Sequence, residues 1–250
     1  MNILILAAGK GTRMNQNLPK VLTPLSGKTF LEHVLDAVGD SKVQLVPHVV
    51  IGHESRQVKE KIKNRLVKFI EQDEQLGTGH AVHICRDHLD LSKPVLVLYG
   101  DHALIQPETI HRLRASFEKH RPVLSMVTYR VPDFSVYGGT FQKYGRILRD
   151  EDENMYAIRE AKDATLEELS IREVNPAYFL FDGPWLWENL KNLGTSNAQS
   201  EYYLTDLVEL AIEQGKMVDT VVGNDLTEAI GVNTPEQLAI AEKVYMARNS

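Results

Sequence analysis

The feature that most constrains the fold is a regular alternation, in the first half of the chain, of short apolar runs and segments with helical spacing. Residues 3–6 form the first run, which is wholly apolar, as expected of a strand buried on both faces. Residues 30–38 follow with apolar side chains at helical spacing. Further apolar runs occupy residues 49–51, 67–70 and 95–99. This alternation predicts an α/β fold with a doubly wound, mostly parallel sheet.

The pattern changes after about residue 123. Strand-like stretches then occur as YGRILRD at 144–150, NMYAIRE at 154–160 and EVNPAYFLFD at 173–182. Such a block predicts a small antiparallel lobe beside the parallel core. A helix is expected at residues 204–214, and a last one begins at Thr234, which can cap it, with Pro235 in its first turn.

The chain has no internal repeat and no low-complexity linker. Its 250 residues are 43% hydrophobic, which is enough for a sizeable buried core. We therefore expect a single domain over residues 1–250, without a left-handed β-helix of hexapeptide repeats. The lone Cys85 excludes an internal disulfide framework, and no signal-peptide pattern or membrane-spanning apolar run is present. A cytoplasmic location without membrane association is the expectation.

The net charge of −6 argues against nucleic-acid binding through a general basic surface. The local distribution is different, because no acidic residue precedes Glu32, whereas four basic residues do: Lys10, Arg13, Lys20 and Lys28. A solvated basic face is one interpretation of this bias. An anion-binding site within an acidic protein is the other.

The loop after the first strand has the sequence AAGKGTRM. It lacks the last glycine of G-x-G-x-x-G and the spacing of G-x-x-x-x-G-K-[ST], so neither a dinucleotide fold nor a P-loop is predicted. Gly9 and Gly11 nevertheless let backbone N–H groups approach a ligand closely. Thr12, Arg13 and Lys20 add donors that suit phosphate oxygens. A plain strand-to-helix turn with exposed basic residues is the alternative.

The string LAAGKGTRMNQNLPKVL at 6–22 closely resembles the opening signature of sugar-1-phosphate nucleotidylyltransferases, and most closely that of bacterial N-acetylglucosamine-1-phosphate uridylyltransferases. The resemblance continues in the family's order through EQLGTGHAV at 74–82, LYGDHALI at 98–105, YGRILRDE at 144–151, IREAKDA at 158–164, EVN at 173–175, NAQSEYYLTD at 197–206 and GVNTPEQLAIAE at 231–242. It implies a Rossmann-like nucleotidyltransferase fold and transfer of a uridylyl group from UTP to N-acetylglucosamine 1-phosphate, with release of pyrophosphate.

The resemblance also implies roles for individual residues. Arg13 and Lys20 would be catalytic and contact the phosphates undergoing transfer. Either Gln72 or Gln75 would bind uracil, whose edge offers a donor and acceptors that an amide can satisfy. Gln72 is favoured because the Gln75 side chain directly abuts the turn. The full set of implied nucleotide contacts is Leu6, Ala8, Gly9, Gly11, Thr12, Gln72, Gln75, Gly77 and Thr78. A polar loop without a ligand is the alternative for the glutamine-rich segment.

Metal and sugar contacts are implied in the same way. Asp101 ends an apolar strand and faces an anion loop, where a carboxylate is costly unless a cation mediates. Mg²⁺ suits this place because it favours carboxylates, water and phosphate oxygens. The resemblance implies Asn233 as a second oxygen ligand. In isolation, Asp101 would be an N-cap or turn residue and Asn233 a turn residue. The implied sugar contacts are Tyr99, Gly100, Gly145, Glu160, Asn175, Tyr203 and Thr205.

Two departures from the family's pattern leave alternatives open. His102 and Ala103 stand where the family has a small residue and a proline, and Pro176 and Ala177 replace a threonine and a glycine beside Asn175. Because proline fixes φ and removes a donor, the sugar could differ from N-acetylglucosamine 1-phosphate. A catalytically silent protein that binds nucleotide sugars is a further alternative. The sequence does not decide whether the protein forms a homo-oligomer, or whether a separate protein supplies acetyltransferase activity.

Overall fold

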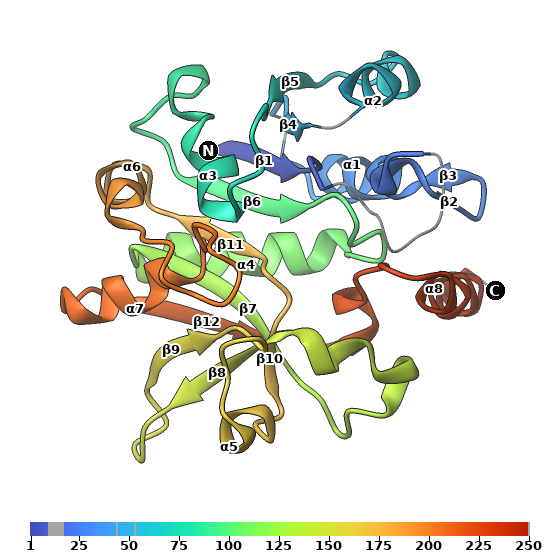
Figure 1. Ribbon diagram of the computed structural model, residues 1–250. Coiled ribbons are helices and arrows are strands. Elements are labelled where there is room, and N and C mark those ends of the chain that lie inside the picture. Colours follow the sequence, from blue (N-terminus) through green and yellow to red (C-terminus); the bar gives the residue numbers. More distant parts are fainter. Residues whose placement is uncertain (10–17, 44, 53, 250) are drawn as a thin grey trace.

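The computed structural model describes residues 1–9, 18–43, 45–52 and 54–249, and a large twisted sheet runs through it (Figure 1). The strand order is β5-β4-β1-β6-β11-β7-β10-β8-β9, and β12 also pairs with β7. The strands of this sheet are β1 (Asn2–Leu6), β4 (His48–Ile51), β5 (Lys68–Glu71), β6 (Val95–Tyr99), β7 (Leu124–Arg130), β8 (Gly145–Arg149), β9 (Met155–Arg159), β10 (Glu173–Asn175), β11 (Phe179–Phe181) and β12 (Val218–Val222). A separate hairpin joins β2 (Pro24–Leu25) to β3 (Lys28–Thr29).

The two halves of the sheet differ in direction. Strands β5, β4, β1 and β6 are parallel neighbours, as the apolar runs of the first half predict. Strand β11 enters antiparallel between β6 and β7, and β12 lies parallel to β7. Strands β10, β8 and β9 pair antiparallel and form the lobe at the bottom of Figure 1. The α/β fold with a doubly wound sheet and an antiparallel lobe is therefore confirmed.

Helices cover both faces of the sheet because the side chains of each strand alternate between them. Ile3 and Ile5 pack in one core cluster with α1 and α4, whereas Leu4 and Leu6 pack in the other with α3, α6 and α7. The helices are α1 (Phe30–Asp40), α2 (Ser55–Ile62), α3 (Thr78–His83), α4 (Pro107–His120), α5 (Leu166–Leu169), α6 (Gly183–Asn189), α7 (Asp206–Glu213) and α8 (Pro235–Arg248). Short 3-10 helices are η2 (Lys20–Leu22), η3 (Arg86–His88), η4 (Val136–Lys143), η5 (Leu190–Asn192) and η6 (Leu226–Ala229).

Local signals place the helices that border the site. Thr234 caps α8 by accepting a hydrogen bond from the Gln237 backbone N–H, and Pro235 occupies the first turn, as predicted. Helix α7 begins at Asp206 and lies within the segment expected to be helical. Among the described residues, no helix is both long and apolar enough to cross a membrane.

The carboxyl ends of the parallel strands meet at one edge. Leu6, the last residue of β1, pairs with Tyr99, the last residue of β6, and with Val50 of β4. The segments that follow β1, β5 and β6 therefore leave the sheet side by side. This edge is where ligands bind in open α/β sheets.

Candidate active site

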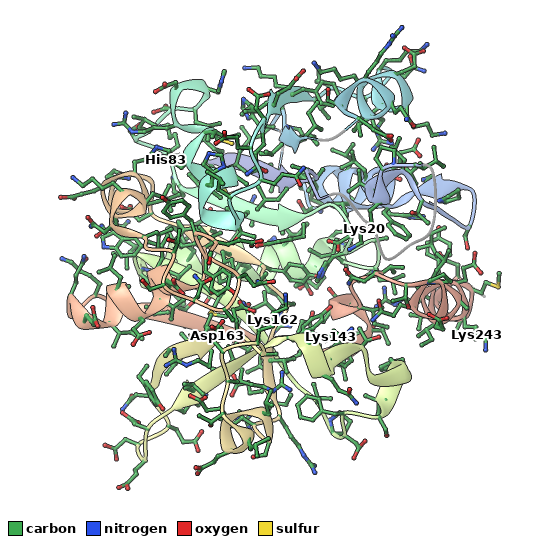
Figure 2. The ribbon with its side chains drawn as sticks, viewed as in Figure 1. Lys20, His83, Lys143, Lys162, Asp163 and Lys243 are labelled. Atoms are coloured by element: carbon green, nitrogen blue, oxygen red, sulfur yellow. The ribbon has the colours of Figure 1, made fainter. Side chains whose placement is uncertain are left out.

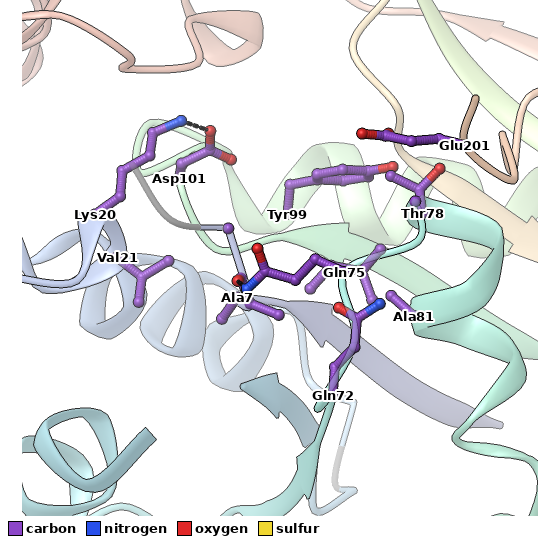
Figure 3. A pocket seen from close by; sticks show the side chains of 14 residues that line it. Ala7, Lys20, Val21, Gln72, Gln75, Thr78, Ala81, Tyr99, Asp101 and Glu201 are labelled. Carbon is purple, nitrogen blue, oxygen red and sulfur yellow. Dashed lines mark hydrogen bonds and ion pairs between the residues drawn. The ribbon is translucent and has the colours of Figure 1, made fainter. Parts of the chain in front are cut away.

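A cavity of about 260 Å³, the first cavity, opens at the carboxyl ends of β1, β5 and β6 (Figure 3). It is framed by the segment after β1, the start of η2, the segment between β5 and α3, and the end of β6. Its lining residues are Leu6, Ala7, Ala8, Gly9, Lys20, Val21, Gln72, Gln75, Gly77, Thr78, Ala81, Tyr99, Asp101 and Glu201.

A second cavity of about 230 Å³ adjoins the first and shares four of its lining residues, Thr78, Tyr99, Asp101 and Glu201. Its other walls come from the antiparallel lobe, from the segment before α7 and from Asn233, which precedes α8. Lys143 on its wall and Lys20 on that of the first cavity belong to different halves of the chain (Figure 2). The two cavities thus form one continuous site with Asp101 at the junction.

Most residues implied by the sequence line these cavities. Lys20 and the implied nucleotide contacts among the described residues line the first. Gly145, Glu160, Asn175, Tyr203, Thr205 and Asn233 line the second. Gly100 lines neither: its N–H donates to the Leu6 carbonyl, 2.9 Å away, and it packs behind the site. Gly11, Thr12 and Arg13 lie outside the described residues.

Gly77 explains how two distant segments meet in the wall. Its φ is +110°, and a Cβ there would lie 2.6 Å from the Tyr202 carbonyl oxygen. The close approach lets the Tyr202 N–H donate to the Leu76 carbonyl and lets Thr78 accept from the Leu204 N–H. Only glycine fits this combination of positive φ and backbone contact. The turn after Gln75 is therefore clamped to the segment before α7.

Gln72 and Gln75 reach the first cavity with different constraints. Gln72 is buried, and its Nε2 lies 2.9 Å from His80 Nδ1. Gln75 Nε2 donates to the Ala8 carbonyl over 2.7 Å, so its amide ties the segment after β1 to the turn. Both glutamines line the cavity, as implied, and Gln75 also has a clear structural contact.

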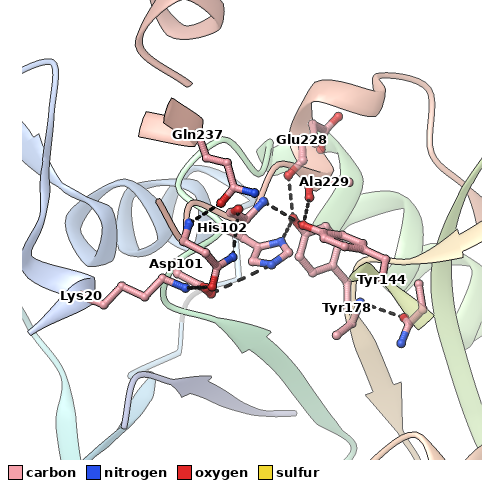
Figure 4. A network of polar contacts seen from close by, with 12 residues as sticks. Lys20, Asp101, His102, Tyr144, Tyr178, Glu228, Ala229 and Gln237 are labelled. Atoms are coloured by element: carbon pink, nitrogen blue, oxygen red, sulfur yellow. Dashed lines mark hydrogen bonds and ion pairs between the residues drawn. The ribbon is translucent and has the colours of Figure 1, made fainter. Parts of the chain in front are cut away.

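Lys20 and Asp101 meet at the junction of the cavities (Figure 4), and Asn233 contacts Lys20 there. The Lys20 ammonium forms an ion pair with the Asp101 carboxylate and donates to Asn233 Oδ1 over 2.7 Å. Burial alone would raise the pKa of Asp101, but the charge and hydrogen bond of Lys20 hold it below its usual range. The side chains are only 11% and 18% exposed, so this pair is far less screened than a surface salt bridge.

Two tyrosines hold the segment that carries Asn233. The Tyr178 hydroxyl donates to the Glu228 carbonyl over 2.7 Å. The Tyr144 hydroxyl donates to the Ala229 carbonyl over 2.5 Å and accepts from the Gly231 N–H over 2.8 Å. Sequence reasoning missed both tyrosines as site residues. Their positions in YGRILRD and EVNPAYFLFD lie beside implied sugar contacts, but the partners are 50 and 85 residues away and leave no local signal.

His102 lies between the Tyr178 hydroxyl and the Asp101 carboxylate. Its Nδ1 is 2.9 Å from the Tyr178 hydroxyl, and its Nε2 is 4.0 Å from Asp101 Oδ1. Burial lowers the pKa of His102, and the Asp101 carboxylate opposes that shift only in part. The imidazole is therefore neutral near pH 7.

The second cavity has a polar wall from the antiparallel lobe and the segment before α7. Burial raises the pKa of Glu160, which accepts a hydrogen bond from the Thr205 hydroxyl over 3.2 Å. Tyr203 accepts from Gln199 Nε2 over 2.9 Å. Such fixed carboxylate and hydroxyl groups suit a ligand rich in hydroxyls.

The departure at Pro176 and Ala177 changes the same wall. Ala177 has a φ of +65°, a conformation that suits glycine better, and its N–H donates to Asn175 Oδ1 over 2.8 Å. The backbone thus keeps the left-handed turn while presenting an extra methyl group and a proline ring to the second cavity.

The MobA-like NTP transferase domain family matches residues 3–170, which contain both the loop after β1 and Asp101. The chain belongs to this family. Among curated proteins, the bifunctional protein GlmU of Streptococcus uberis is 42% identical over 246 residues, covering 98% of this chain and 52% of that protein. GlmU of Alcanivorax borkumensis is 42% identical over 243 residues, covering 97% and 51%. The chain thus spans about half the length of the curated relatives it matches.

The family's fold recurs in solved structures of much lower identity. A UDP-glucose pyrophosphorylase complexed with UDP-glucose superposes with a TM-score of 0.77 at 16% identity, covering 99% of this chain and 98% of that one. The MobA-like NTP transferase match and this likeness agree on a Rossmann-like nucleotidyltransferase fold. The family resemblance inferred from the ordered motifs is confirmed.

Proposed function

We propose that this protein transfers a uridylyl group from UTP to N-acetylglucosamine 1-phosphate, giving UDP-N-acetylglucosamine and pyrophosphate. The observation that carries the proposal is the junction of the two cavities at Asp101, with Lys20 and Asn233 beside it. A nucleotide in the first cavity and a sugar phosphate in the second would bring their phosphates together there. The 42% identity to bifunctional GlmU proteins supports the substrates.

The reaction needs positioning and charge neutralisation rather than a general base. A phosphate monoester is already largely dianionic at neutral pH, so its oxygen attacks the α-phosphorus of UTP directly. The bond from the α-phosphorus to the bridging oxygen breaks, and pyrophosphate leaves with the electron pair. Lys20 neutralises charge on the phosphates as it develops, and Arg13 is proposed to do the same from the loop after β1.

The residues at the junction fit a divalent cation. The ammonium of Lys20 acts as a stand-in, since it already lies between the Asp101 carboxylate and Asn233 Oδ1. Within the described part of the chain, no three His, Cys, Asp or Glu side chains form a metal-binding group. A carboxylate and an amide oxygen, with phosphate oxygens and water, are the set that Mg²⁺ favours. We propose Mg²⁺, which would neutralise phosphate charge when bound.

We assign the base to the first cavity and the sugar to the second. Gln72 is proposed to contact uracil, because Gln75 is engaged with the Ala8 carbonyl. Gly77 and Thr78 would complete the base pocket. Glu160, Asn175, Thr205, Tyr203 and Gly145 are proposed to surround the sugar, with Tyr99 between the two ligands.

Residues 1–250 are proposed to form a single nucleotidyltransferase domain that works in the cytoplasm, where UTP and sugar phosphates are made. The curated relatives are bifunctional, so an acetyltransferase partner is compatible with this assignment. No nucleic-acid or membrane partner is proposed.

The test is release of pyrophosphate from UTP and Mg²⁺ with N-acetylglucosamine 1-phosphate, glucose 1-phosphate and glucosamine 1-phosphate in parallel. Release with the first alone supports the proposal. The wall formed by Pro176 and Ala177 favours a second candidate, a uridylyltransferase for another sugar 1-phosphate, which release with glucose 1-phosphate or glucosamine 1-phosphate alone would support. UTP binding without turnover on any acceptor would indicate a silent nucleotide-sugar-binding protein instead.

A further inference from the structure

His102 places an imidazole nitrogen beside the candidate cation ligands. The residue is 7% exposed and lines the second cavity, and its Nε2 lies 4.0 Å from Asp101 Oδ1 (Figure 4). Neither the mechanism above nor the family pattern, which has a small residue here, uses this nitrogen. Its chemistry depends on which ring nitrogen carries the hydrogen.

The hydrogen-bond network decides the tautomer. The Glu228 carbonyl can only accept, so the Tyr178 hydroxyl directs its single hydrogen to it over 2.7 Å. His102 Nδ1, 2.9 Å from the same hydroxyl oxygen, must then donate its N–H. In the neutral imidazole this leaves the lone pair on Nε2, on the side of Asp101. A buried hydrogen bond from the other ring nitrogen is also what orients metal-binding histidines.

Gly231 borders Nε2, where only a residue without a side chain avoids a steric clash. A Cβ built on Gly231 would lie 2.8 Å from His102 Nε2 and 2.9 Å from the Tyr144 hydroxyl. Any larger residue at position 231 would crowd Nε2. The separation of 4.0 Å from Asp101 Oδ1 is also within the span of about 4.2 Å that two donors of one cation can reach at bond lengths near 2.1 Å.

We propose that His102 Nε2 is a third donor of the cation site formed by Asp101 and Asn233. An imidazole nitrogen favours Co²⁺ and related transition-metal ions over Mg²⁺, which prefers oxygen ligands. The site of this chain therefore binds such ions more tightly than a site with only the two oxygen donors would. The inference rests on the proposed function for the role of the site, but cation binding is measured without substrates.

The experiment is titration of the ligand-free protein with Co²⁺ and, separately, with Mg²⁺ by calorimetry, with the visible spectrum of bound Co²⁺ as second readout. His102→Ala should lower Co²⁺ affinity by at least about tenfold and change the spectrum, while Mg²⁺ affinity stays within about twofold. His102→Gln, which keeps more of the side-chain volume, should behave likewise if His102→Ala unfolds. Gly231→Ala should also weaken Co²⁺ binding, because its methyl group crowds Nε2.

Two further variants guard the interpretation. Asp101→Asn should weaken both cations, whereas His111→Ala, an exposed histidine on α4, should change neither. Unchanged Co²⁺ affinity and spectrum in folded His102 variants would overturn the proposal. So would wild-type Co²⁺ affinity in Asp101→Asn, because the ion would then bind elsewhere. Failure of the proposed function is a separate result, namely no pyrophosphate release with any acceptor while Co²⁺ titration is as expected.

Discussion

Removal of the Tyr178 hydroxyl tests whether its hydrogen bonds hold in place the segment that carries Asn233. Tyr178→Phe keeps the ring, so it leaves no cavity, but it deprives two buried groups of their partner: the Glu228 carbonyl and His102 Nδ1–H. A buried polar group left unpaired costs about 1–3 kcal/mol. Two such groups, offset in part because the hydroxyl itself is no longer buried, give an expected loss of about 2–4 kcal/mol in the free energy of unfolding.

Urea unfolding followed by circular dichroism measures this loss. An unchanged m-value would show that the surface area exposed on unfolding is the same in both proteins. Tyr156→Phe is the matched control, because Tyr156 is 45% exposed, and it should stay within about 0.5 kcal/mol of the wild type. The folded Tyr178→Phe protein should also need more Mg²⁺ for half-maximal pyrophosphate release, with a smaller change in kcat. A loss of less than about 0.5 kcal/mol in the free energy of unfolding, with an unaltered Mg²⁺ requirement, would refute the claim that Tyr178 holds this segment.

Three further outcomes are expected. Lys20→Met should lower the rate of pyrophosphate release by about a hundredfold or more with the circular dichroism spectrum unchanged, and a wild-type rate would remove Lys20 from catalysis. Gly77→Ala should destabilise the protein by at least about 2 kcal/mol, since its φ is +110° and its Cβ would meet the Tyr202 carbonyl, whereas Gly194→Ala, with nothing within 4 Å, should be nearly neutral in urea unfolding. Burial lowers the pKa of His48 in the folded state, so the unfolded state binds the proton more readily. The stabilising contribution of neutral His48 should therefore be full above about pH 6.5 and fall as the pH drops below it. In a plot of the urea midpoint against pH, His48→Leu should flatten this part of the curve.

The parallel half of the fold could be predicted because its signals are local. The wholly apolar run at β1 requires burial on both faces, and the structure divides it accordingly between two core clusters. Thr234 and Pro235 mark the start of α8 by capping chemistry that involves only neighbouring residues. The antiparallel lobe could also be predicted, from the strand-like stretches after about residue 123. The place of β11 between β6 and β7 could not be predicted, because pairing of distant strands depends on tertiary packing.

Site residues within the ordered family motifs could be predicted, whereas residues placed by contacts between distant segments could not. Asp101 and Asn233 are 132 positions apart, yet the resemblance brought them together, and the shared contact with Lys20 agrees. Gly100 stays a prediction as a sugar contact; it lines neither cavity, and its N–H donates to the Leu6 carbonyl. Tyr144 was missed because its hydroxyl bonds to a segment 85 residues away, and periodicity contains no information on such a contact.

His102, Pro176 and Ala177, which depart from the family pattern, line the same cavity, and Tyr178 holds His102 there. A buried histidine beside a carboxylate is costly unless its ring nitrogens find partners. Tyr178, two residues after Pro176, supplies the partner for Nδ1 of His102, and Gly231 leaves room at Nε2. Without the Tyr178 hydroxyl, the buried Nδ1–H of His102 would have no acceptor, and without His102 the Tyr178 hydroxyl would lose one of its two hydrogen bonds. The two residues therefore act as a unit, and a double variant His102→Val/Tyr178→Phe should cost less than the sum of the single changes, as a double-mutant cycle measures.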